Sequence, residues 1–562
     1  MSDSIQKHDK GSIKDTLISI TIALVVAFVF RAFVVEAFVI PTGSMAPTLM
    51  GQHMRFRSPQ TGYEWPVNPW RDVQLANGQI VPARVQTNIE VTDPMSGAKI
   101  TRDSEPLRSG DRILVIKYLA GLFTPQRFDC FVFKAPHEPQ VNYIKRLLGL
   151  PGEQIALIDG DVFVRDADPD DATAAASEVW SLPDWRIARK PDRVQVAVWQ
   201  DVFSSEYQPL RPVTDDRAWF RSPWVGVDGS WEIDGRRSYR LDGGGPGVLE
   251  WDSDRWPIGD RYPYNETDNA RGARLRSAAP GEFTAFPINQ STLVFPVADL
   301  RMAVGVQPER DGGFVAATIQ ARGHEFRGVI EGETCRVQMR PMSRGEVDTP
   351  WVTLGHGAII PLRAGRVTNV EFWHVDQALT LRVDDAVVAH GEYNWSPQER
   401  IAHATSRSIE WILREEDSTG RNVFGQTRAY APGLARPRWE FGAGAVTLHR
   451  VSIARDVHYQ PTNARGDVLL AAHPTRTPRL TSRLDGPNAF DQFFACGDNS
   501  PASSDSRMWE AVDPWVGHDI DTTIGIVPQR LVIGKAFGVY FPSLLRSRPV
   551  PMVDFGRVRW IW

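Results

Sequence analysis

The longest apolar run of the chain lies close to its N-terminus. Leu17–Phe30 holds no charged residue, and within the longer stretch 13–35 charged residues occur only near the two ends. About 20 apolar residues are needed to cross a hydrocarbon core as a helix, and long basic side chains near the ends of such a helix reach back to water. The pattern therefore predicts a transmembrane helix over residues 13–35, after a short tail at residues 1–12.

The flanks of this run predict its orientation. No Ala-x-Ala cleavage pattern ends it, which favours a retained anchor over a removable secretory signal. Lys7, Lys10 and Lys14 precede it, and basic residues favour the cytoplasmic side of a membrane. Because no second apolar run of this length follows, we expect a single pass through the lipid bilayer, a cytoplasmic N-terminus and a body outside the cytoplasm.

Short apolar segments and turn residues alternate through much of the remaining chain. Residues 109–164 have the pattern of strands and end in a hairpin, with Asp159-Gly160-Asp161 between two apolar runs. Residues 286–458 form a longer series of short strands, at a spacing that indicates a two-sheet sandwich. This series resembles the concanavalin-like jelly roll without a diagnostic motif, so it predicts no lectin function by itself. The chain is expected to be mainly β.

The segments around the second strand series carry weaker signals. Residues 165–285 are rich in Asp, Trp and Gly with little periodicity, and we expect an irregular insertion there. Residues 459–487 are expected to be a linker, and residues 546–562 a C-terminal tail. None of these segments shows a pattern that indicates a chemistry.

A repeated turn pattern occurs in residues 52–108, which are expected to form a small β-rich insertion. The segments 58–62 and 93–97 share the arrangement x-Pro-x-[Ser/Thr]-Gly, the shape of zinc-ribbon knuckles that carry Cys at the first and fourth positions. Those positions here hold Ser58, Thr61, Asp93 and Ser96. Such side chains cannot replace four thiolates, so no zinc is expected. The insertion is either a ribbon that has lost its metal or a pair of ordinary Pro-Gly turns.

Composition and charge exclude several classes of function. A chain of 562 residues is too long for one core and indicates two to four domains. The net charge of −5 indicates no general affinity for nucleic acid. Three cysteines, Cys130, Cys335 and Cys496, are too few for a disulfide framework, and whether Cys130 and Cys496 pair stays open. The twelve histidines include no H-E-x-x-H, which disfavours a metalloprotease.

Candidate chemistry follows directly after the apolar run. Ser44 lies in Pro41-Thr42-Gly43-Ser44-Met45, and Lys145 lies in Tyr-Ile-Lys-Arg about a hundred residues later. A serine hydroxyl needs a base to become a nucleophile, and lysine is a base only when burial lowers its pKa from about 10.4. Taken alone, a Ser-Met or a Lys-Arg pair is far more often structural than catalytic. Ser44 is also not in a G-x-S-x-G elbow, which excludes an α/β-hydrolase on pattern.

Six segments in a fixed order change this assessment. Together they resemble the type I (leader) signal peptidase family, serine proteases with a Ser–Lys dyad. Each segment is weak alone, and the ordered set is specific. The matching segments are Arg31–Leu49, Gly110–Tyr118, Phe128–Pro136, Tyr143–Gly152, Gly497–Arg507 and Val527–Ala536.

The resemblance implies a fold and a set of site residues. The fold is a catalytic body of coiled β-sheets, here formed by residues 36–51, 109–164 and 488–545, with the other segments inserted into its loops. Ser44 corresponds to the nucleophile and Lys145 to the general base. The Ser44 amide and the Thr42 hydroxyl would form the oxyanion hole. The remaining positions are the supporting residues Ser503, Asp505, Arg507, Asp498 and Asn499, and the substrate-binding residues Phe38, Ile40, Met45, Leu49, Tyr143 and Ile144.

Two positions depart from the family pattern. Thr42 stands where the family usually has serine, which keeps the hydroxyl and adds a methyl group. The family often has arginine after the Gly-Asp-Asn turn, whereas this chain continues with Ser500-Pro501. The oxyanion donor and the support of that turn are therefore the two places where this chain is expected to differ.

The function that the resemblance implies is that of a signal peptidase I in the inner (cytoplasmic) membrane. It would cleave signal peptides from exported pre-proteins after small residues at −3 and −1, without a metal or other cofactor. The alternative is a membrane-anchored module with a vestigial peptidase, in which the inserted sandwich binds an unspecified glycan or protein. The first interpretation is favoured because Ser44 and Lys145 are both present in their local motifs.

Overall fold

The structure is a computed structural model of the chain. The predicted tail at residues 1–12 lies outside the residues that it describes. The described residues are 13–74, 80–84, 87–117, 125–167, 175–209, 222–233, 235–260, 295–342, 349–426, 429, 434–463, 466–487, 489–542, 544–545, 552–553 and 557–561.

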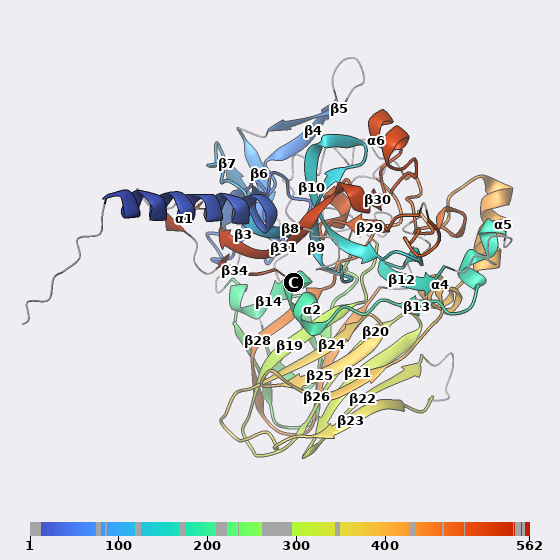
Figure 1. Cartoon of the computed structure of the whole chain (residues 1–562). Helices are drawn as coiled ribbons and strands as arrows, with labels where there is room; N and C mark the ends of the chain where they lie inside the picture. The colour runs from blue at the N-terminus through green and yellow to red at the C-terminus, as the bar shows by residue number, and fades with distance from the viewer. Residues whose placement is uncertain are drawn as a thin grey trace, which may run out of the picture.

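An eight-stranded antiparallel sheet forms the centre of the upper body in Figure 1. Its order is β1-β8-β31-β9-β10-β29-β30, and β34 pairs with β31. Three distant parts of the sequence therefore meet in one sheet. The strands are β1 (Val35–Val39), β8 (Arg112–Lys117), β9 (Cys130–Ala135), β10 (Glu138–Gly149), β29 (Gln492–Cys496), β30 (Val527–Pro528), β31 (Val532–Phe541) and β34 (Arg559–Trp560).

Burial along β10 explains why this strand is central. Its first half alternates between exposed side chains and buried or half-buried ones, whereas every residue from Ile144 to Gly149 is buried. Alternation is typical of a strand with one solvated face, and continuous burial is typical of a strand covered on both faces. The buried half of β10 carries Lys145 and Arg146, two charged side chains that must find partners inside the protein.

The hairpin predicted near residue 160 is present. β11 (Glu153–Ile158) pairs with β12 (Asp161–Asp166), and β13 (Arg186–Ile187) adds to β12. Asp159 and Gly160 connect the strands with φ of 50° and 90°, the left-handed backbone that a two-residue hairpin loop requires.

The insertion at 52–108 consists of short hairpins, as expected. The turn at 58–62 connects β2 (Met54–Arg57) to β3 (Glu64–Val67), and the turn at 93–97 connects β6 (Ile89–Thr92) to β7 (Lys99–Arg102). Between them β4 (Trp70–Gln74) pairs with β5 (Ile80–Arg84).

The four positions of the zinc-like pattern converge in space. The hydroxyls of Thr61 and Ser96 donate hydrogen bonds of 3.0 and 2.7 Å to the same carboxylate oxygen of Asp93. The Ser58 hydroxyl accepts a bond of 3.2 Å from the Thr61 amide. All four side chains are buried. The Thr61–Asp93 hydrogen bond therefore joins the two turns, whereas the other two bonds lie within one turn each.

A two-sheet sandwich forms the lower body in Figure 1. One sheet has the order β16-β17-β28-β19-β24-β25-β26, with β14 on β28, and the other has the order β15-β18-β27-β20-β21-β22-β23. Side chains from both sheets share one core that includes Phe203, Trp439 and Phe372. The strands are β14 (Gln200–Ser204), β15 (Trp224–Asp228), β16 (Ser230–Glu232), β17 (Ser238–Asp242), β18 (Gly247–Trp251), β19 (Leu300–Pro308), β20 (Phe314–Ala321), β21 (His324–Glu331), β22 (Thr334–Pro341), β23 (Val352–Ala358), β24 (Thr368–Val375), β25 (Ala378–Val383), β26 (Ala386–Glu392), β27 (Arg436–Phe441) and β28 (Val446–Arg455).

The mainly β fold is confirmed, and the predicted start of the sandwich at residue 286 is wrong. Five strands between residues 200 and 251 belong to its two sheets. Their buried residues include Trp224, Tyr239 and Trp251, so these aromatic side chains of the supposed irregular insertion lie in the sandwich core. Short strands broken by Gly and Asp hide the period of two on which strand prediction depends.

Short helices lie outside the sheets. α2 (Asp192–Val198) precedes β14, whereas α4 (Pro397–Thr405) and α5 (Ile409–Thr419) follow β26. α6 (Pro514–Asp519) precedes β30, and the short 3-10 turns are η2 (Ala176–Ser181), η3 (Ser205–Tyr207), η5 (Pro474–Arg476), η6 (Ser500–Ala502) and η7 (Gln529–Leu531). A small hairpin of β32 (Leu544–Leu545) and β33 (Met552–Val553) lies near the C-terminus.

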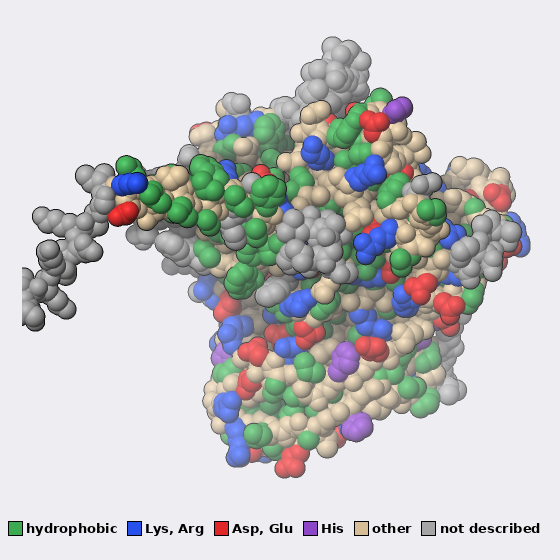
Figure 2. Space-filling model, in the orientation of Figure 1, with side chains coloured by type: hydrophobic (Ala, Val, Ile, Leu, Met, Phe, Trp, Pro, Cys, Tyr) green, Lys and Arg blue, Asp and Glu red, His purple; other side chains and the backbone are tan. Residues whose placement is uncertain are grey.

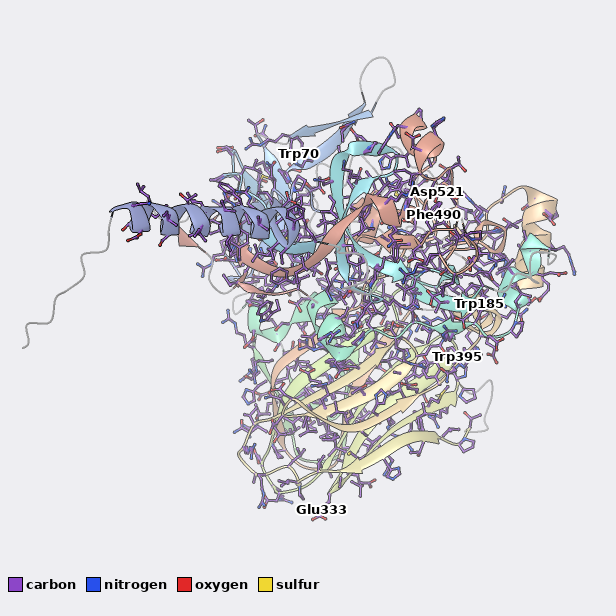
Figure 3. All side chains as sticks on the ribbon, in the orientation of Figure 1. Trp70, Trp185, Glu333, Trp395, Phe490 and Asp521 are labelled. Atoms are coloured by element: carbon purple, nitrogen blue, oxygen red, sulfur yellow. The ribbon has the colours of Figure 1, made fainter. Side chains whose placement is uncertain are left out.

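A buried network of charges joins the sandwich to the peptidase hairpin. Arg322 of the sandwich pairs with Asp159 of the hairpin turn at 2.7 Å and with Asp299 at 2.6 Å. Arg400 of α4 is fully buried and pairs with Asp159 and Asp161. Figure 3 labels Trp185 and Trp395 in this junction region, far from Glu333 at the outer end of the sandwich. The two bodies therefore share buried ion pairs, not only a surface contact.

Four carboxylates of this network, Asp161, Asp299, Asp376 and Asp456, have oxygens within 4.8 Å of one another. Lys190 lies among them, 2.6 Å from Asp376 and 2.8 Å from Asp456. Lys190, Arg322 and Arg400 therefore compensate the negative charge of these carboxylates. Burial raises the pKa of Asp456 to about 6 against the opposing effect of Lys190.

Helix α1 (Ile13–Phe33) projects from the upper body (Figure 1), and apolar side chains follow it in Figure 2. Its exposed apolar residues are Leu17, Ile18, Ile20, Ile22, Leu24, Val25, Val26, Phe28, Val29 and Phe33. Within the described residues, no helix combines the length and the apolar character needed to cross a membrane, so the transmembrane prediction for residues 13–35 is unsupported.

Candidate active site

The loop that follows β1 is held by the start of β8. The amide of Ile40 donates to the carbonyl oxygen of Asp111 at 3.0 Å, and the amide of Met50 donates to the Asp111 carboxylate at 2.9 Å. At Gly110 an added Cβ would lie 1.8 Å from the Ile40 carbonyl oxygen. The two ends of the loop 40–50 are thus tied to the same residue, which fixes the position of Ser44 between them.

Ser44 and Lys145 come together at the centre of this region. Lys145 lies on β10 opposite Phe131 of β9, and its Nζ is 2.7 Å from the Ser44 Oγ. Both side chains are buried, with 6% of Ser44 and 3% of Lys145 exposed. A serine hydroxyl and a lysine amine at this distance can exchange a proton directly.

Burial sets the electrostatics of the lysine. It lowers the pKa of Lys145 to about 8, against the nearby Asp505 carboxylate, which raises it. The ammonium lies 5.0 Å from the centre of the Tyr143 ring. A pKa near 8 means that a sizeable fraction of the amine is neutral at weakly alkaline pH, as a general base requires.

The Gly-Asp-Asn turn contacts the nucleophile loop through its backbone and one side chain. The Asn499 amide donates to the Ser44 carbonyl oxygen at 3.0 Å, and its side-chain Nδ2 donates to the Gly43 carbonyl oxygen at 3.1 Å. At Gly497 an added Cβ would lie 2.4 Å from the Ser44 carbonyl oxygen and 2.3 Å from the Ser503 hydroxyl. Only glycine allows this close approach.

Ser503 lies next to Gly497 and makes no side-chain hydrogen bond to Ser44 or Lys145. Its side chain is 2% exposed, and among the described residues its hydroxyl has no hydrogen-bond partner. The predicted bond from Ser503 to the Lys145 amine is therefore not formed in this structure. Its position next to Gly497 leaves a buried hydroxyl close to the Ser44 backbone.

Asp505 and Arg507 form the expected ion pair. The Arg507 Nη2 and the Asp505 Oδ2 are 2.8 Å apart, and both side chains are fully buried. Asp505 also accepts a 3.0 Å hydrogen bond from the Gly497 amide. Arg507 and these bonds hold the pKa of Asp505 below its usual value against the effect of burial.

One buried partner of the site was missed from the sequence. Arg146 donates from Nε and Nη2 to both oxygens of Asp498, at 2.7 and 2.6 Å. Neighbouring side chains on a strand point to opposite faces, so Lys145 and Arg146 serve different contacts. The Lys-Arg pair on a strand buried on both faces was the signal that could have identified this second ion pair.

Two hydrogen-bond donors of the loop 40–50 have no partner among the described residues. Among the described residues, neither the Thr42 hydroxyl nor the Ser44 amide makes a hydrogen bond. Thr42 is exposed, whereas Ser44 is buried. Unpartnered donors near a nucleophile are available to a negative charge that develops during the reaction.

Most of the predicted substrate-binding residues share one hydrophobic cluster. Ile40, Met45, Leu49 and Ile144 are buried in it, and the half-buried Phe38 packs against it. Tyr143 belongs instead to a second apolar cluster, with Phe133 and Trp509. The predicted substrate-binding residues thus divide between two apolar clusters.

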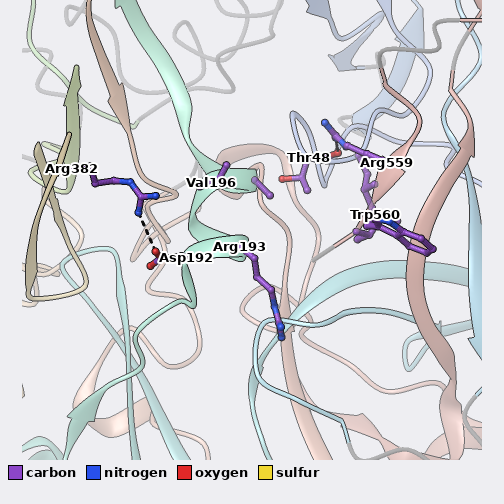
Figure 4. Close-up of a pocket in the computed structure, with 10 residues that line it drawn as sticks. Thr48, Asp192, Arg193, Val196, Arg382, Arg559 and Trp560 are labelled. Carbon is purple, nitrogen blue, oxygen red and sulfur yellow. Dashed lines mark hydrogen bonds and ion pairs between the residues drawn. The ribbon is translucent and has the colours of Figure 1, made fainter. Parts of the chain in front are cut away.

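A cavity of about 590 Å³ lies beside the nucleophile loop (Figure 4). Thr48 and Leu49 of the loop line it together with α2, β25 and β34. On one side of the cavity, the Arg382 Nη1 and the Asp192 Oδ2 form an ion pair at 3.2 Å. On another side, Arg559 donates a hydrogen bond to the Thr48 carbonyl oxygen. Residues of the inserted sandwich therefore form part of the surface next to the loop.

The three cysteines add no covalent link. Cys130, Cys335 and Cys496 are buried and free, so Cys130 and Cys496 do not form a disulfide. Burial raises the pKa of the Cys130 thiol to about 12, which leaves it protonated and unreactive at neutral pH.

Two solved structures align with this chain at low scores. A carbohydrate-binding module, CBM66 from Bacillus subtilis, aligns with 41% of this chain and 94% of that chain at a TM-score of 0.21 and 8% identity. A Bacillus subtilis protein of unknown function with a galectin-like fold aligns with 44% of this chain and 94% of that chain at 0.22 and 9%. Scores this low support no inference about fold or function.

Sequence comparison gives a clear relationship. A family model described as signal peptidase, peptidase S26, matches residues 13–93 and 95–195, which include Ser44 and Lys145. Signal peptidase I of Rickettsia bellii (strain OSU 85-389) is 28% identical over 150 residues, 26% of this chain and 38% of that protein. Signal peptidase I of Rickettsia typhi is 27% identical over 155 residues, 28% of this chain and 44% of that protein. The chain thus spans less than half the length of these relatives. Over these residues the chain is similar to the type I signal peptidase family.

Proposed function

We propose that this protein cleaves signal peptides from exported pre-proteins, with Ser44 as nucleophile and Lys145 as general base. The observation that carries the proposal is the 2.7 Å distance between the Ser44 Oγ and the Lys145 Nζ inside a buried site. The match to the signal peptidase family model supports the reaction class, and the buried lysine can supply the base.

The reaction begins with neutral Lys145. Its Nζ takes the hydroxyl proton of Ser44 as the Oγ attacks the carbonyl carbon of the scissile peptide bond. The resulting oxyanion is stabilised by the Ser44 amide and the Thr42 hydroxyl, two donors without other partners. The carbon–nitrogen bond then breaks, and Lys145 gives its proton to the leaving amine.

Hydrolysis of the acyl-enzyme uses the same base. Lys145 takes a proton from a water molecule, whose oxygen attacks the ester carbon formed on Ser44. Collapse of the second tetrahedral intermediate breaks the bond to Oγ, and the proton returns from Lys145 to Ser44. The products are the signal peptide with a free carboxylate and the shortened pre-protein.

The apolar cluster beside Ser44 fits the expected substrate. Phe38, Ile40, Met45, Leu49 and Ile144 offer no buried charge to a bound peptide. The Tyr143 ring centre lies 5.0 Å from the Lys145 Nζ. Phe38 and Tyr143 are half-buried, so these two apolar side chains can contact the small residues at −3 and −1 that end signal peptides, whereas the other four are buried in the core.

We also propose that α1 attaches the protein to the inner membrane, with residues 1–12 in the cytoplasm and the catalytic body outside it. The exposed apolar side chains of α1 support this proposal, because a surface of this kind favours contact with lipid over water. The nucleophile loop begins within ten residues of the helix end, which would keep Ser44 near a substrate still held in the bilayer.

The test is cleavage of a purified pre-protein by the wild type and by Ser44→Ala and Lys145→Ala. Both variants should lose cleavage, whereas the matched controls Ser104→Ala and Lys99→Ala, which change exposed residues, should keep it. Equal processing by all five proteins would refute the dyad. That result would favour the alternative, a vestigial peptidase whose inserted sandwich binds a glycan or a protein.

A further inference from the structure

We propose that the inserted sandwich positions the nucleophile, because two of its segments hold the turn Asp498–Ser500 against the Ser44 loop. Gln200 and Gln460 make these contacts and act as positioning residues. The inference rests on the proposed function of Ser44, and it goes further by assigning a role in the reaction to the insertion.

The first segment continues the central strand β28 of the sandwich. After β28 ends at Arg455, the chain passes through the buried Asp456, and the Tyr459 amide donates to the Gly160 carbonyl oxygen at 3.0 Å. The next residue, Gln460, donates its backbone amide to the Ser500 hydroxyl at 3.0 Å. Residues 456–460 therefore connect the sandwich sheet to the turn Asp498–Ser500. The sheet holds one end of this segment, and the hydrogen bond to Ser500 holds the other.

The second segment is the first residue of β14. Gln200 pairs with Arg455 across the sheet, so it lies at the same end of the sandwich. Its buried side-chain Nε2 donates to the Asp498 carbonyl oxygen at 3.4 Å. Two neighbouring strands of one sheet thus contact consecutive parts of the same turn.

Further hydrogen bonds connect the turn Asp498–Ser500 to the surroundings of Ser44 and Lys145. Asn499 donates to the carbonyl oxygens of Ser44 and Gly43. On the other side, the Ser500 hydroxyl accepts a 2.7 Å hydrogen bond from the Arg507 Nη1. Arg507 holds Asp505, whose carboxylate is the charge that raises the pKa of Lys145 most. Every side chain in this chain of contacts is buried.

Ser500 is the point at which these contacts meet. Its hydroxyl accepts one hydrogen bond from the Gln460 amide and one from the Arg507 Nη1. Alanine at this position would leave the buried Gln460 amide without an acceptor and the Arg507 Nη1 with only its 3.4 Å bond to the Gln460 carbonyl oxygen. An Arg507 guanidinium held less firmly in this way would neutralise Asp505 less well. The pKa of Lys145 would then rise, because Asp505 would act on it with less opposition.

The experiment compares Ser500→Ala, Ser500→Thr and Gln200→Ala with the wild type, and Ser104→Ala is the matched control. We expect kcat for a pre-protein to fall about 10- to 100-fold in Ser500→Ala, since small misplacements at a reacting centre have costs of this size. KM should stay unchanged, and the rising limb of kcat/KM should move to higher pH. Ser500→Thr should restore both, and Gln200→Ala should lower kcat alone.

Thermal unfolding of each variant separates positioning from stability. If Ser500→Ala does not fold, Gln200→Ala decides the outcome. An unchanged kcat in the folded alanine variants would overturn the inference while wild-type cleavage and its loss in Ser44→Ala still support the proposed function. An inactive wild type would instead refute the proposed function, and the inference with it.

Discussion

Gly497 shows how single residues set the geometry of the site. The Ser44 carbonyl oxygen and the Ser503 hydroxyl both approach its Cα so closely that an added Cβ would lie 2.4 and 2.3 Å from them. The Ser44 carbonyl belongs to the main chain of the nucleophile loop, so it cannot move aside without moving Ser44. Only glycine, which carries a hydrogen where other residues carry Cβ, therefore fits at position 497 without moving Ser44.

We predict that Gly497→Ala lowers kcat/KM by about 100-fold, because a shift of about 1 Å at a reacting centre has a cost of this order. Gly486→Ala is the matched control, since a Cβ there would meet no atom within 4 Å. Steady-state cleavage of a pre-protein by both variants measures the difference. Wild-type kinetics in Gly497→Ala would show that the loop tolerates displacement.

At the scale of residues, the sequence predicts which residues belong to the site better than it predicts their contacts. Ser44 and Lys145 could be paired because their local motifs occur in a recognisable order, and the structure brings their side chains together. The pairing of Arg146 with Asp498, and of Gln460 with Ser500, could not be predicted. These contacts join residues far apart in the chain, and no periodicity or motif relates them.

At the scale of elements, the two hairpin turns at 58–62 and 93–97 adopt the same conformation. Gly62 and Gly97 have φ of 78° and 65°, and each donates its amide to the carbonyl oxygen of the first residue of its turn. Asp93 of the second turn accepts a hydrogen bond from the Thr61 hydroxyl of the first turn and another from Ser96 of its own turn. One carboxylate therefore links the two turns directly.

We predict that Asp93→Ala lowers the free energy of unfolding by about 1–3 kcal/mol, because it leaves the buried hydroxyls of Thr61 and Ser96 without their acceptor. Asp103→Ala, which removes an exposed carboxylate, is the matched control. Denaturant unfolding of the two variants gives both values. Equal stability would show that the hairpins are held by their apolar core alone.

At the scale of the molecule, the sandwich and the peptidase body form one structure. Their junction contains buried ion pairs of Arg322 and Arg400 with Asp159, Asp161 and Asp299. Removing one partner of a buried pair leaves an uncompensated charge, which costs far more than the pair itself contributes. The expectation of an appended insertion in a surface loop is therefore replaced by that of an integral part of the fold.

We predict that Arg400→Met lowers the free energy of unfolding by about 3–5 kcal/mol, the usual cost of breaking a buried ion pair from one side. Arg414→Met on the neighbouring helix α5 changes an exposed arginine and is the matched control. Deletion of residues 165–480 should prevent folding for the same reason. A stable, cooperatively unfolding deletion variant would contradict this account of the junction.

The mainly β class could be predicted from alternation in residues 109–164 and 286–458. The contribution of residues 200–251 to the sandwich could not, because their strands are short and broken by glycine and aspartate. The junction between the sandwich and the peptidase body could not be predicted from the sequence either. The pattern around Asp159 and Asp161 predicts a hairpin turn, and only the structure shows that these aspartates pair with arginines more than 150 residues away.

The pH dependence of kcat/KM tests the central claim most directly. Burial lowers the pKa of Lys145 to about 8, and the base acts only in its neutral form, so cleavage should increase with pH as the ammonium loses its proton. The measurement is pre-protein cleavage by the wild type between pH 6 and pH 10. The account predicts a single rising limb with a midpoint near 8. A profile that is flat over this range would contradict it.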